Sequence, residues 1–272
     1  MLNDESPSPP LRWAGSKRKL LPELMPRIQQ LCTARYIEPF FGSGCVFFKL
    51  QPQCAVIGDL NDNLINFYKQ LKYQPRKLHR EFSTLDQNDG SYYQYRAEYN
   101  EQPEKLRRAA LFLYLNRLSF NAIYRTNMRG EFNVPMGTRV GALPTEDELR
   151  CASKSLKKTE IIRGDFFRSL RNVAEGDFVY LDPPYDYSGR IDRGEYGVGA
   201  FSCLDIERLG AALELIDQRG AHFILSYLDT VEIATIARRW NSECVSVRRQ
   251  VASFSSNRKV VDELIISNRI FL

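Results

Sequence analysis

The segment "FVYLDPPYDYSG", residues 178–189, joins an apolar run to an acid, two prolines and an aromatic residue. Proline donates no main-chain hydrogen bond, so the pair ends a strand and fixes the direction of the backbone. Asp182 and Tyr185 would therefore stand on a stiff platform at the carboxyl end of a buried strand, where open α/β sheets bind their ligands. The alternative that these residues leave open is a rigid turn without a chemical role.

A glycine-rich turn and a later acid suggest which ligand this is. Glycines in "EPFFGSG", residues 38–44, let the backbone approach a ligand after a short strand. No G-x-G-x-x-G or G-K-[ST] pattern is present, so nothing here suits a pyrophosphate. Asp59 ends the next predicted strand, where dinucleotide folds place the acid for a ribose hydroxyl. An adenosine-type ligand without phosphates fits both features, although Asp59 could instead cap the following helix.

A third segment, "RWAGSK" at residues 12–17, has the composition of a loop that faces a ligand. Trp13 either packs on a flat base or covers the core. Lys17 either pairs with a carboxylate or is solvated. The residues of this loop do not decide between these alternatives by themselves.

Histidine and cysteine usage argues against several other chemistries. The two histidines, His79 and His222, lack partner motifs, so a histidine-based triad or metal site is not indicated. None of the six cysteines forms a C-x-x-C pair, so the sequence predicts neither a zinc site nor a redox motif. Cys45 and Cys54 have apolar neighbours and are expected to be small buried residues.

Length and composition limit the architecture. The 272 residues, 43% of them hydrophobic, suit one domain with a large insertion, or two domains. The net charge of +5 is compatible with nucleic-acid binding but does not establish it. With no signal peptide and no long apolar run, we expect a cytoplasmic protein and no membrane partner.

The elements that position these segments follow an interrupted α/β pattern. Strand, glycine turn, helix and second strand come first, and the pattern resumes near residue 159. Residues 62–158 between them read as helical and basic, with Thr145 and Glu148 as a capping box. Within this stretch "NMRGEFNVP" predicts a hairpin around a central glycine. We therefore predict an α/β sheet domain of residues 1–61 and 159–272 that carries a helical insertion of residues 62–158.

Taken together, the segments resemble a known family. They follow in the order "RWAGSK", "EPFFGSG", "DLNDNL", "LNRLSFNAIYRTNMRGEFNVPMG", "GDF", "DPPY" and "SSNRKVVDELIISN". This order, from about residue 10 to residue 268, resembles the α group of the Dam-like DNA adenine-N6 methyltransferases. The resemblance implies a Rossmann-like α/β fold with a seven-stranded methyltransferase sheet. It also implies a helical DNA-recognition insertion that carries a β-hairpin.

The resemblance implies S-adenosyl-L-methionine as the methyl donor and assigns residues to it. Asp59 matches the acid for the ribose, and Asp165 and Phe166 match the segment beside the adenine. The remaining cofactor residues come from the first two segments and DPPY: Trp13, Ala14, Gly15, Lys17, Phe40, Gly42, Gly44 and Asp182. The resemblance implies no metal.

DPPY takes a catalytic role in this reading, through Asp182, Pro183, Pro184 and Tyr185. The amino group of adenine is a poor nucleophile because its lone pair delocalises into the ring. The Asp182 carboxylate and the Pro183 carbonyl can accept both amino hydrogens, which frees the lone pair for attack on the sulfonium methyl. Tyr185 can stack on the base, and a base in a duplex must be flipped out to reach this site.

The insertion would bind double-stranded DNA, usually at GATC in this family. Arg125 in the hairpin can bond a guanine edge with two hydrogen bonds. Phe120 and Asn121 match the loop that enters the base stack. Further DNA contacts are expected, mostly to the backbone, from Arg12, Arg96, Asn127, Asn133, Pro135, Ser256 and Lys259. A DNA-associated protein in the cytoplasm is implied, and a companion restriction nuclease is compatible with this reading.

Four positions depart from the family pattern. Arg12 and Phe120 stand where lysine and tyrosine are common, Thr138 where a basic residue is common, and Tyr227 where asparagine is frequent. These differences bear on the recognised site and the strength of DNA binding, not on DPPY. Rival readings are methylation of cytosine N4 or of adenine in RNA, or a catalytically silent DNA-binding subunit. Cytosine-N4 enzymes more often carry serine in place of Asp182, and RNA enzymes usually lack the hairpin.

Overall fold

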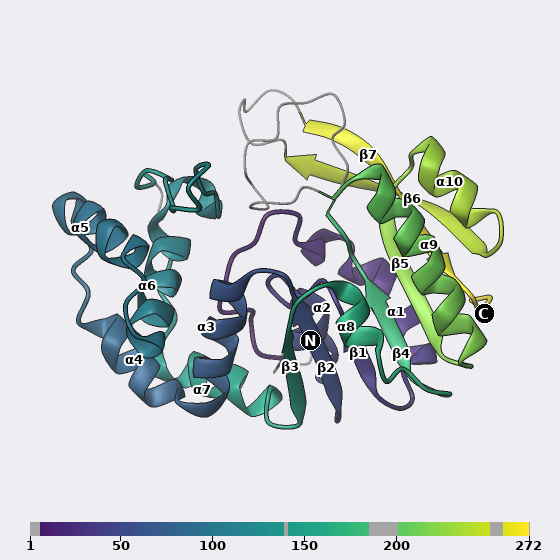
Figure 1. Ribbon diagram of the computed structural model, residues 1–272, viewed down its shortest axis with the longest axis horizontal. Coiled ribbons are helices and arrows are strands. Elements are labelled where there is room, and N and C mark those ends of the chain that lie inside the picture. Colours follow the sequence, from purple (N-terminus) through teal and green to yellow (C-terminus); the bar gives the residue numbers. More distant parts are fainter. Residues whose placement is uncertain (1–5, 139–140, 185–200, 251–257, 272) are drawn as a thin grey trace.

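The computed structural model describes residues 6–138, 141–184, 201–250 and 258–271. Within these ranges a seven-stranded sheet has the order β3-β2-β1-β4-β5-β7-β6 (Figure 1). The strands are β1 (Tyr36–Glu38), β2 (Ala55–Asp59), β3 (Thr159–Arg163), β4 (Phe178–Leu181), β5 (His222–Leu228), β6 (Asn241–Gln250) and β7 (Arg258–Ser267). The first five strands pair in parallel, and β7 runs antiparallel to β5 and β6. The predicted seven-stranded α/β sheet is confirmed.

The central strands are apolar because the sheet is covered on both faces. Tyr36 and Phe178 belong to the hydrophobic cluster on one face, whereas their neighbours Ile37 and Val179 belong to the cluster on the other. This alternation is the period of two that a strand imposes on its side chains. One face packs on α1 (Leu21–Leu31), α2 (Cys45–Leu50) and α3 (Asp62–Tyr73). The other packs on α8 (Phe166–Leu170), α9 (Cys203–Gln218) and α10 (Val231–Ala237).

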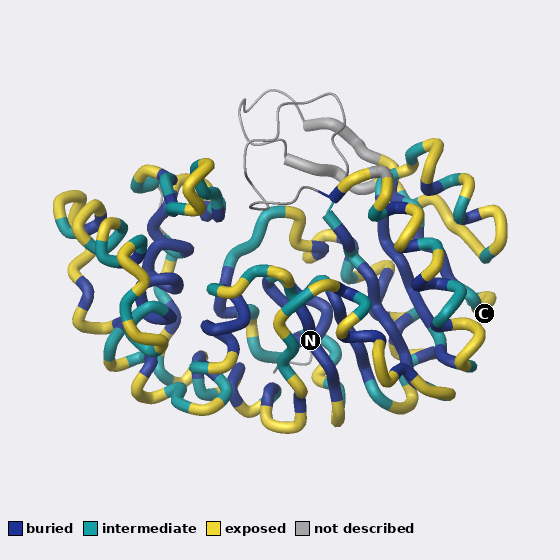
Figure 2. Tube along the Cα trace, viewed as in Figure 1, coloured by how far each residue is buried: buried dark blue, intermediate teal, exposed yellow. Residues whose placement is uncertain are grey.

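Between β2 and β3 the chain leaves the sheet to form a helical region, seen at the left of Figure 1. Its helices after α3 are α4 (Pro75–Ser83), α5 (Asp89–Asn100), α6 (Lys105–Leu118) and α7 (Glu146–Ser155). Helix α6 is buried on every side from Ala109 to Asn116, which agrees with its unbroken apolar sequence. Figure 2 shows this burial as a dark blue helix inside the region.

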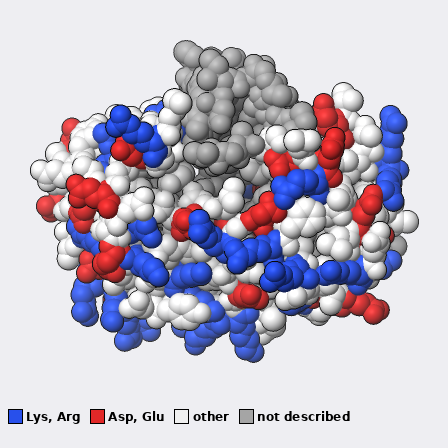
Figure 3. Space-filling view, viewed as in Figure 1, with Lys and Arg blue, Asp and Glu red and all other residues white. Residues whose placement is uncertain are grey.

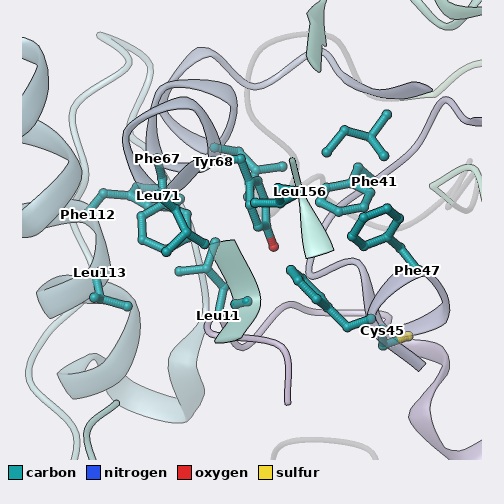
Figure 4. Close-up of a cluster of buried hydrophobic side chains, with 14 of the residues drawn as sticks. Leu11, Phe41, Cys45, Phe47, Phe67, Tyr68, Leu71, Phe112, Leu113 and Leu156 are labelled. Carbon is teal, nitrogen blue, oxygen red and sulfur yellow. The ribbon is translucent and has the colours of Figure 1, made fainter. Parts of the chain in front are cut away.

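The helical region shares a hydrophobic core with the sheet. Phe112 of α6, Phe67 and Leu71 of α3, and Phe47 of α2 belong to one cluster of buried residues (Figure 4). Helix α3 therefore joins the two parts by packing rather than only by chain connection. The division into domains at residues 61/62 and 158/159 stays a prediction.

Local signals in the sequence account for several element ends. The capping box of α7 is confirmed, since Glu148 N donates to the Thr145 hydroxyl at 3.2 Å and Thr145 N donates to the Glu148 carboxylate at 2.7 Å. The predicted hairpin is present as antiparallel bridges, Thr126 with Phe132 and Ser119 with Met136. Gly130 closes its turn with φ +78°.

One expectation from the sequence was wrong. Cys54 is exposed, because it lies just before β2, where its carbonyl accepts from Tyr36 N at 3.0 Å. Strand β3 ends at Arg163, because Gly164 takes φ +137° and Asp165 caps α8. No helix in the described part of the chain is both long and apolar enough to cross a membrane.

Candidate active site

Three acids stand where three neighbouring parallel strands end. Glu38 is the last residue of β1, Asp59 the last of β2, and Asp182 follows β4 directly. In the sheet β1 lies between β2 and β4, and the strand order reverses at β1. The carboxyl ends of these three strands therefore surround the place where open α/β sheets bind their ligands. All three acids line one pocket of about 530 Å³. A cavity of this size accommodates a small-molecule ligand.

The glycine turn and Asp59 form one hydrogen-bonded unit. Gly42 N donates to Asp59 Oδ2 at 3.0 Å, and Asn61 N donates to Oδ1 at 2.9 Å. Asp59 is not the cap of α3, because Asn61 caps it by accepting from the first-turn amides. Burial raises the pKa of Asp59 to about 6 despite these main-chain donors. Asp59 is therefore held in one orientation at the edge of the pocket.

Asp182 is fixed by side chains from distant parts of the sequence. The Lys17 ammonium forms an ion pair with its Oδ1, and Ser226 Oγ donates to the same atom at 3.4 Å. The Tyr227 hydroxyl donates to the Pro184 carbonyl at 3.3 Å. The turn after β4 is thus held by hydrogen bonds as well as by its prolines, which preorganises the acceptors around Asp182.

Aromatic rings line another wall of the pocket. Phe40 lies 5.2 Å from Phe166 between ring centroids and makes an edge contact with Phe201 at 6.1 Å. Asp165, at the same end, caps α8 and forms an ion pair with Arg208 at 2.8 Å. This end of the pocket suits a flat, apolar ring system.

The structure brings nearly all of the predicted cofactor residues together. Those that line the pocket are Trp13, Ala14, Gly15, Lys17, Phe40, Gly42, Asp59, Asp165, Phe166 and Asp182, along with Pro183 and Pro184. Gly44 does not line it. With φ +65°, Gly44 precedes α2, and a Cβ there would lie 2.4 Å from the Phe41 ring. Gly44 therefore serves the turn itself, and Tyr185 lies outside the described residues.

Tyr124, at the start of the hairpin, contacts the pocket, and the sequence did not predict this contact. The Tyr124 ring stacks on Trp13 with 5.6 Å between centroids and 20° between planes. Asn63 Nδ2, from α3, donates to the Tyr124 hydroxyl at 3.2 Å, and both residues line the pocket. Tyr124 directly precedes Arg125 in the sequence, but its position there does not reveal which way its ring faces.

The hairpin orders the side chains proposed for DNA. Arg125 Nε donates to Asn133 Oδ1 at 2.9 Å, which orients the guanidinium. Asn127 accepts from the main-chain nitrogens of Arg129 and Glu131, at 2.9 and 3.0 Å, so its side chain builds the turn. Asn127 and Asn133 thus have structural roles besides any contact with DNA.

The loop before the hairpin is exposed and strained. Phe120 is 48% exposed, and its main-chain nitrogen donates to the Pro135 carbonyl at 2.9 Å. Asn121 and Ala122 both have φ +53°, which is unfavourable for residues with a Cβ and is found at functional loops. The loop therefore presents an aromatic ring outwards on a fixed backbone.

Two further residues proposed for DNA contacts, Arg96 and Arg12, are held by hydrogen bonds to the hairpin and to α6. Arg96 Nη1 donates to the Val134 carbonyl at 3.3 Å. The Arg12 main chain exchanges two hydrogen bonds with the Asn116 side chain of α6, at 2.9 and 2.7 Å. Ser256 lies outside the described residues, as does the side chain of Lys259.

On the face drawn in Figure 3, basic and acidic side chains lie among one another. Figure 3 shows Lys and Arg side chains in a band over the lower part of this face, interspersed with acidic side chains. Arg163 and Arg208, for example, form ion pairs with Asp62 and Asp165. Among the described residues, no group of three or more His, Cys, Asp or Glu side chains could hold a metal ion.

Comparison with known proteins identifies the family. The family model "D12 class N6 adenine-specific DNA methyltransferase" matches residues 13–252. The chain belongs to this family. The type II methyltransferase M1.LlaDCHI of Lactococcus lactis subsp. cremoris is 34% identical over 271 residues, which cover 94% of each chain. The DNA adenine methylase of Escherichia coli (strain K12) is 32% identical over 263 residues, 94% of this chain and 93% of the other.

A third relative is similar over nearly its whole length. The type II methyltransferase M.MjaIII of Methanocaldococcus jannaschii is 31% identical over 284 residues, 96% of this chain and 98% of its own. The resemblance inferred from the motif order is therefore confirmed, and the chain is an adenine-specific DNA methyltransferase. In this methyltransferase the family match includes the DPPY turn, the glycine turn and the whole helical region.

Proposed function

We propose that this methyltransferase transfers a methyl group from S-adenosylmethionine to N6 of an adenine in a GATC site of duplex DNA. One observation carries the proposal: the acids that end β2 and follow β4 open into the same pocket. A ribose bound at Asp59 and a base bound at Asp182 would therefore be neighbours. The pocket also offers aromatic rings for the adenine of the donor.

The donor would be held by residues of three segments. Asp59 would accept hydrogen bonds from the ribose hydroxyls, Phe40 and Phe166 would pack against the adenine, and the Trp13 loop would close over the methionine part. When bound, S-adenosylmethionine supplies an electrophilic methyl group. This reaction would need no metal ion, because the amino nitrogen attacks a methyl carbon that is bonded to a good leaving group, the sulfonium sulfur.

Asp182 and the Pro183 carbonyl would activate the target base. Each accepts one amino hydrogen, so the nitrogen becomes more tetrahedral and its lone pair is directed at the methyl carbon. Methyl transfer would leave the electron pair of the broken S–C bond on sulfur, and the methylated nitrogen would release one proton to solvent. Because the pocket lies at the strand ends, an adenine must leave the duplex to enter it. Phe120, whose ring is exposed, would fill the gap in the stack.

Methyl transfer with a labelled donor tests this function. We expect the purified protein to label a duplex with one unmethylated GATC site, but not the same duplex carrying N6-methyladenine on both strands, nor the RNA of the same sequence. Nucleoside mass spectrometry should find N6-methyldeoxyadenosine. Label in N4-methylcytosine or in RNA would overturn the proposal in favour of the rival enzyme readings.

Donor affinity should depend on Asp59 and on pH. Replacing Asp59 by alanine should weaken donor binding by about 1–3 kcal/mol, the cost of losing a charge-assisted hydrogen bond. Since burial raises the pKa of Asp59 to about 6, the carboxylate is protonated at a higher pH than an ordinary aspartate. Binding to the wild type should therefore weaken as the pH falls through this pKa, because the protonated acid accepts fewer hydrogen bonds.

Calorimetry with S-adenosylhomocysteine measures both effects. The titration runs from about pH 5 to about pH 8, a range that brackets the raised pKa of Asp59. The Asp59→Ala protein should bind weakly at every pH, without the acid-side loss. Glu23→Ala, which removes an exposed acid of α1, serves as the control and should behave like the wild type. Unchanged affinity in a folded Asp59→Ala protein would remove Asp59 from the donor site.

A further inference from the structure

The Lys17 ammonium lies between two carboxylates rather than beside one. It forms an ion pair with Asp182 Oδ1 and lies 3.6 Å from Glu263 Oε2. Lys17 begins the short 3-10 helix Lys17–Lys19 before α1, Asp182 lies in the turn after β4, and Glu263 lies in strand β7. Lys17 is 3% exposed and Glu263 1% exposed, so their charges interact at low dielectric and with little screening by salt.

Glu263 occupies a position where the fold would favour an apolar residue. It pairs with Leu228 of β5 and Val245 of β6, in the interior of the sheet. Its neighbour on the same face, Ile265, is completely buried. Replacing a buried ion pair by apolar residues is often neutral or stabilising, so stability alone gives a weak reason for an acid here.

The charge balance around Asp182 gives a stronger reason. With Lys17 alone, Asp182 would belong to a neutral pair, and the ammonium would compete with the target amino group for its oxygen. With Glu263, the three groups together carry one negative charge, and the ammonium has a second partner within reach. A small displacement of the flexible lysine chain would bring Nζ from Asp182 Oδ1 to Glu263 Oε2.

We propose that Glu263 is a positioning residue for methyl transfer, which acts through Lys17. In the free protein Lys17 holds Asp182 in place. When the target adenine enters, Glu263 takes a larger share of the ammonium, so that Lys17 neutralises less of the negative charge on Asp182 Oδ1 as this oxygen accepts an amino hydrogen. This inference rests on the proposed methyl transfer to adenine and adds a residue of β7 to that site.

The substitution Glu263→Gln tests the role of the charge, because it preserves the size of the side chain. Single-turnover transfer to a GATC duplex should slow by about tenfold, less than the loss expected for a group that bonds the base directly. Affinity for S-adenosylhomocysteine and for the duplex should stay within about twofold of wild type, because neither ligand is held by Glu263. Glu263→Asp, which keeps the charge, should transfer faster than Glu263→Gln.

A matched control comes from the adjacent strand. Glu243 of β6 also pairs with a basic residue, Arg27, but its side chain is 44% exposed and is not among the described residues that line the pocket. Glu243→Gln should transfer at the wild-type rate. Thermal unfolding of each protein reports stability separately, so a purely structural effect of Glu263 would lower the melting temperature without slowing transfer by the folded protein.

A double-mutant cycle with Lys17→Gln tests the route of the effect. If Glu263 acts through Lys17, Glu263→Gln should add little in the Lys17→Gln background. Equal losses in both backgrounds, a wild-type rate in Glu263→Gln, or a Glu263→Asp protein no faster than Glu263→Gln would each overturn the inference. Failure of the wild type itself to methylate the duplex would instead refute the proposed function.

Discussion

Replacing Asp182 by alanine should reduce single-turnover methyl transfer to a GATC duplex by at least about 10²-fold, as expected when a preorganised group that stabilises charge is removed. Without its carboxylate, only the Pro183 carbonyl remains to accept an amino hydrogen, and the amino lone pair stays delocalised in the base. Donor and DNA binding should change much less than the transfer rate, because Asp182 is proposed to act on the reacting nitrogen.

The structure indicates that this variant should fold. Lys17, which pairs with Asp182, keeps Glu263 at 3.6 Å as a second carboxylate, so its buried ammonium is not left without a counterion. Rapid-quench assays and circular dichroism would measure the rate and the fold. Asp147→Ala, which removes an 88% exposed acid of α7, is the control and should be fully active. An Asp182→Ala protein that transfers at the wild-type rate would refute the mechanism.

The second large effect is expected in sequence discrimination. Arg125→Ala should relax the preference at one guanine of GATC by about 1–3 kcal/mol, the value of a bidentate contact with a base. In the structure Asn133 accepts from Arg125 Nε. Among the described residues, the Nη1 and Nη2 groups make no hydrogen bond, so they can donate together to O6 and N7 of guanine.

Competition binding with duplexes substituted at each position of GATC measures this preference. Arg129, exposed at the tip of the same hairpin, provides the matched control. Arg129→Ala should weaken binding to all sequences alike or leave it unchanged, because loss of a phosphate contact carries no sequence information. If Arg125→Ala weakens cognate and altered duplexes equally, Arg125 is a backbone contact and its assignment to guanine is wrong.

The order of elements and the ends of β2 and β4 followed from the sequence because they depend on local physical rules. Alternating burial made the central strands recognisable, and the pair of prolines after Asp182 marked where β4 ends. The capping box at Thr145 and the turn at Gly130 depend on residues within three or four positions of each other. Such signals also placed Asp59 at the end of β2.

Only the tertiary structure decided which distant side chains meet. Lys17, Asp182 and Glu263 belong to segments far apart in the chain, and no spacing in the sequence relates them. The same holds for the Tyr124 ring on Trp13, and for Gly44, whose conformation serves packing against Phe41 instead of the pocket. Local propensity determines the backbone conformation of a few neighbouring residues. Contacts between distant segments depend instead on the twist of the sheet and on how the helices pack against it, and the packing of the whole core determines both.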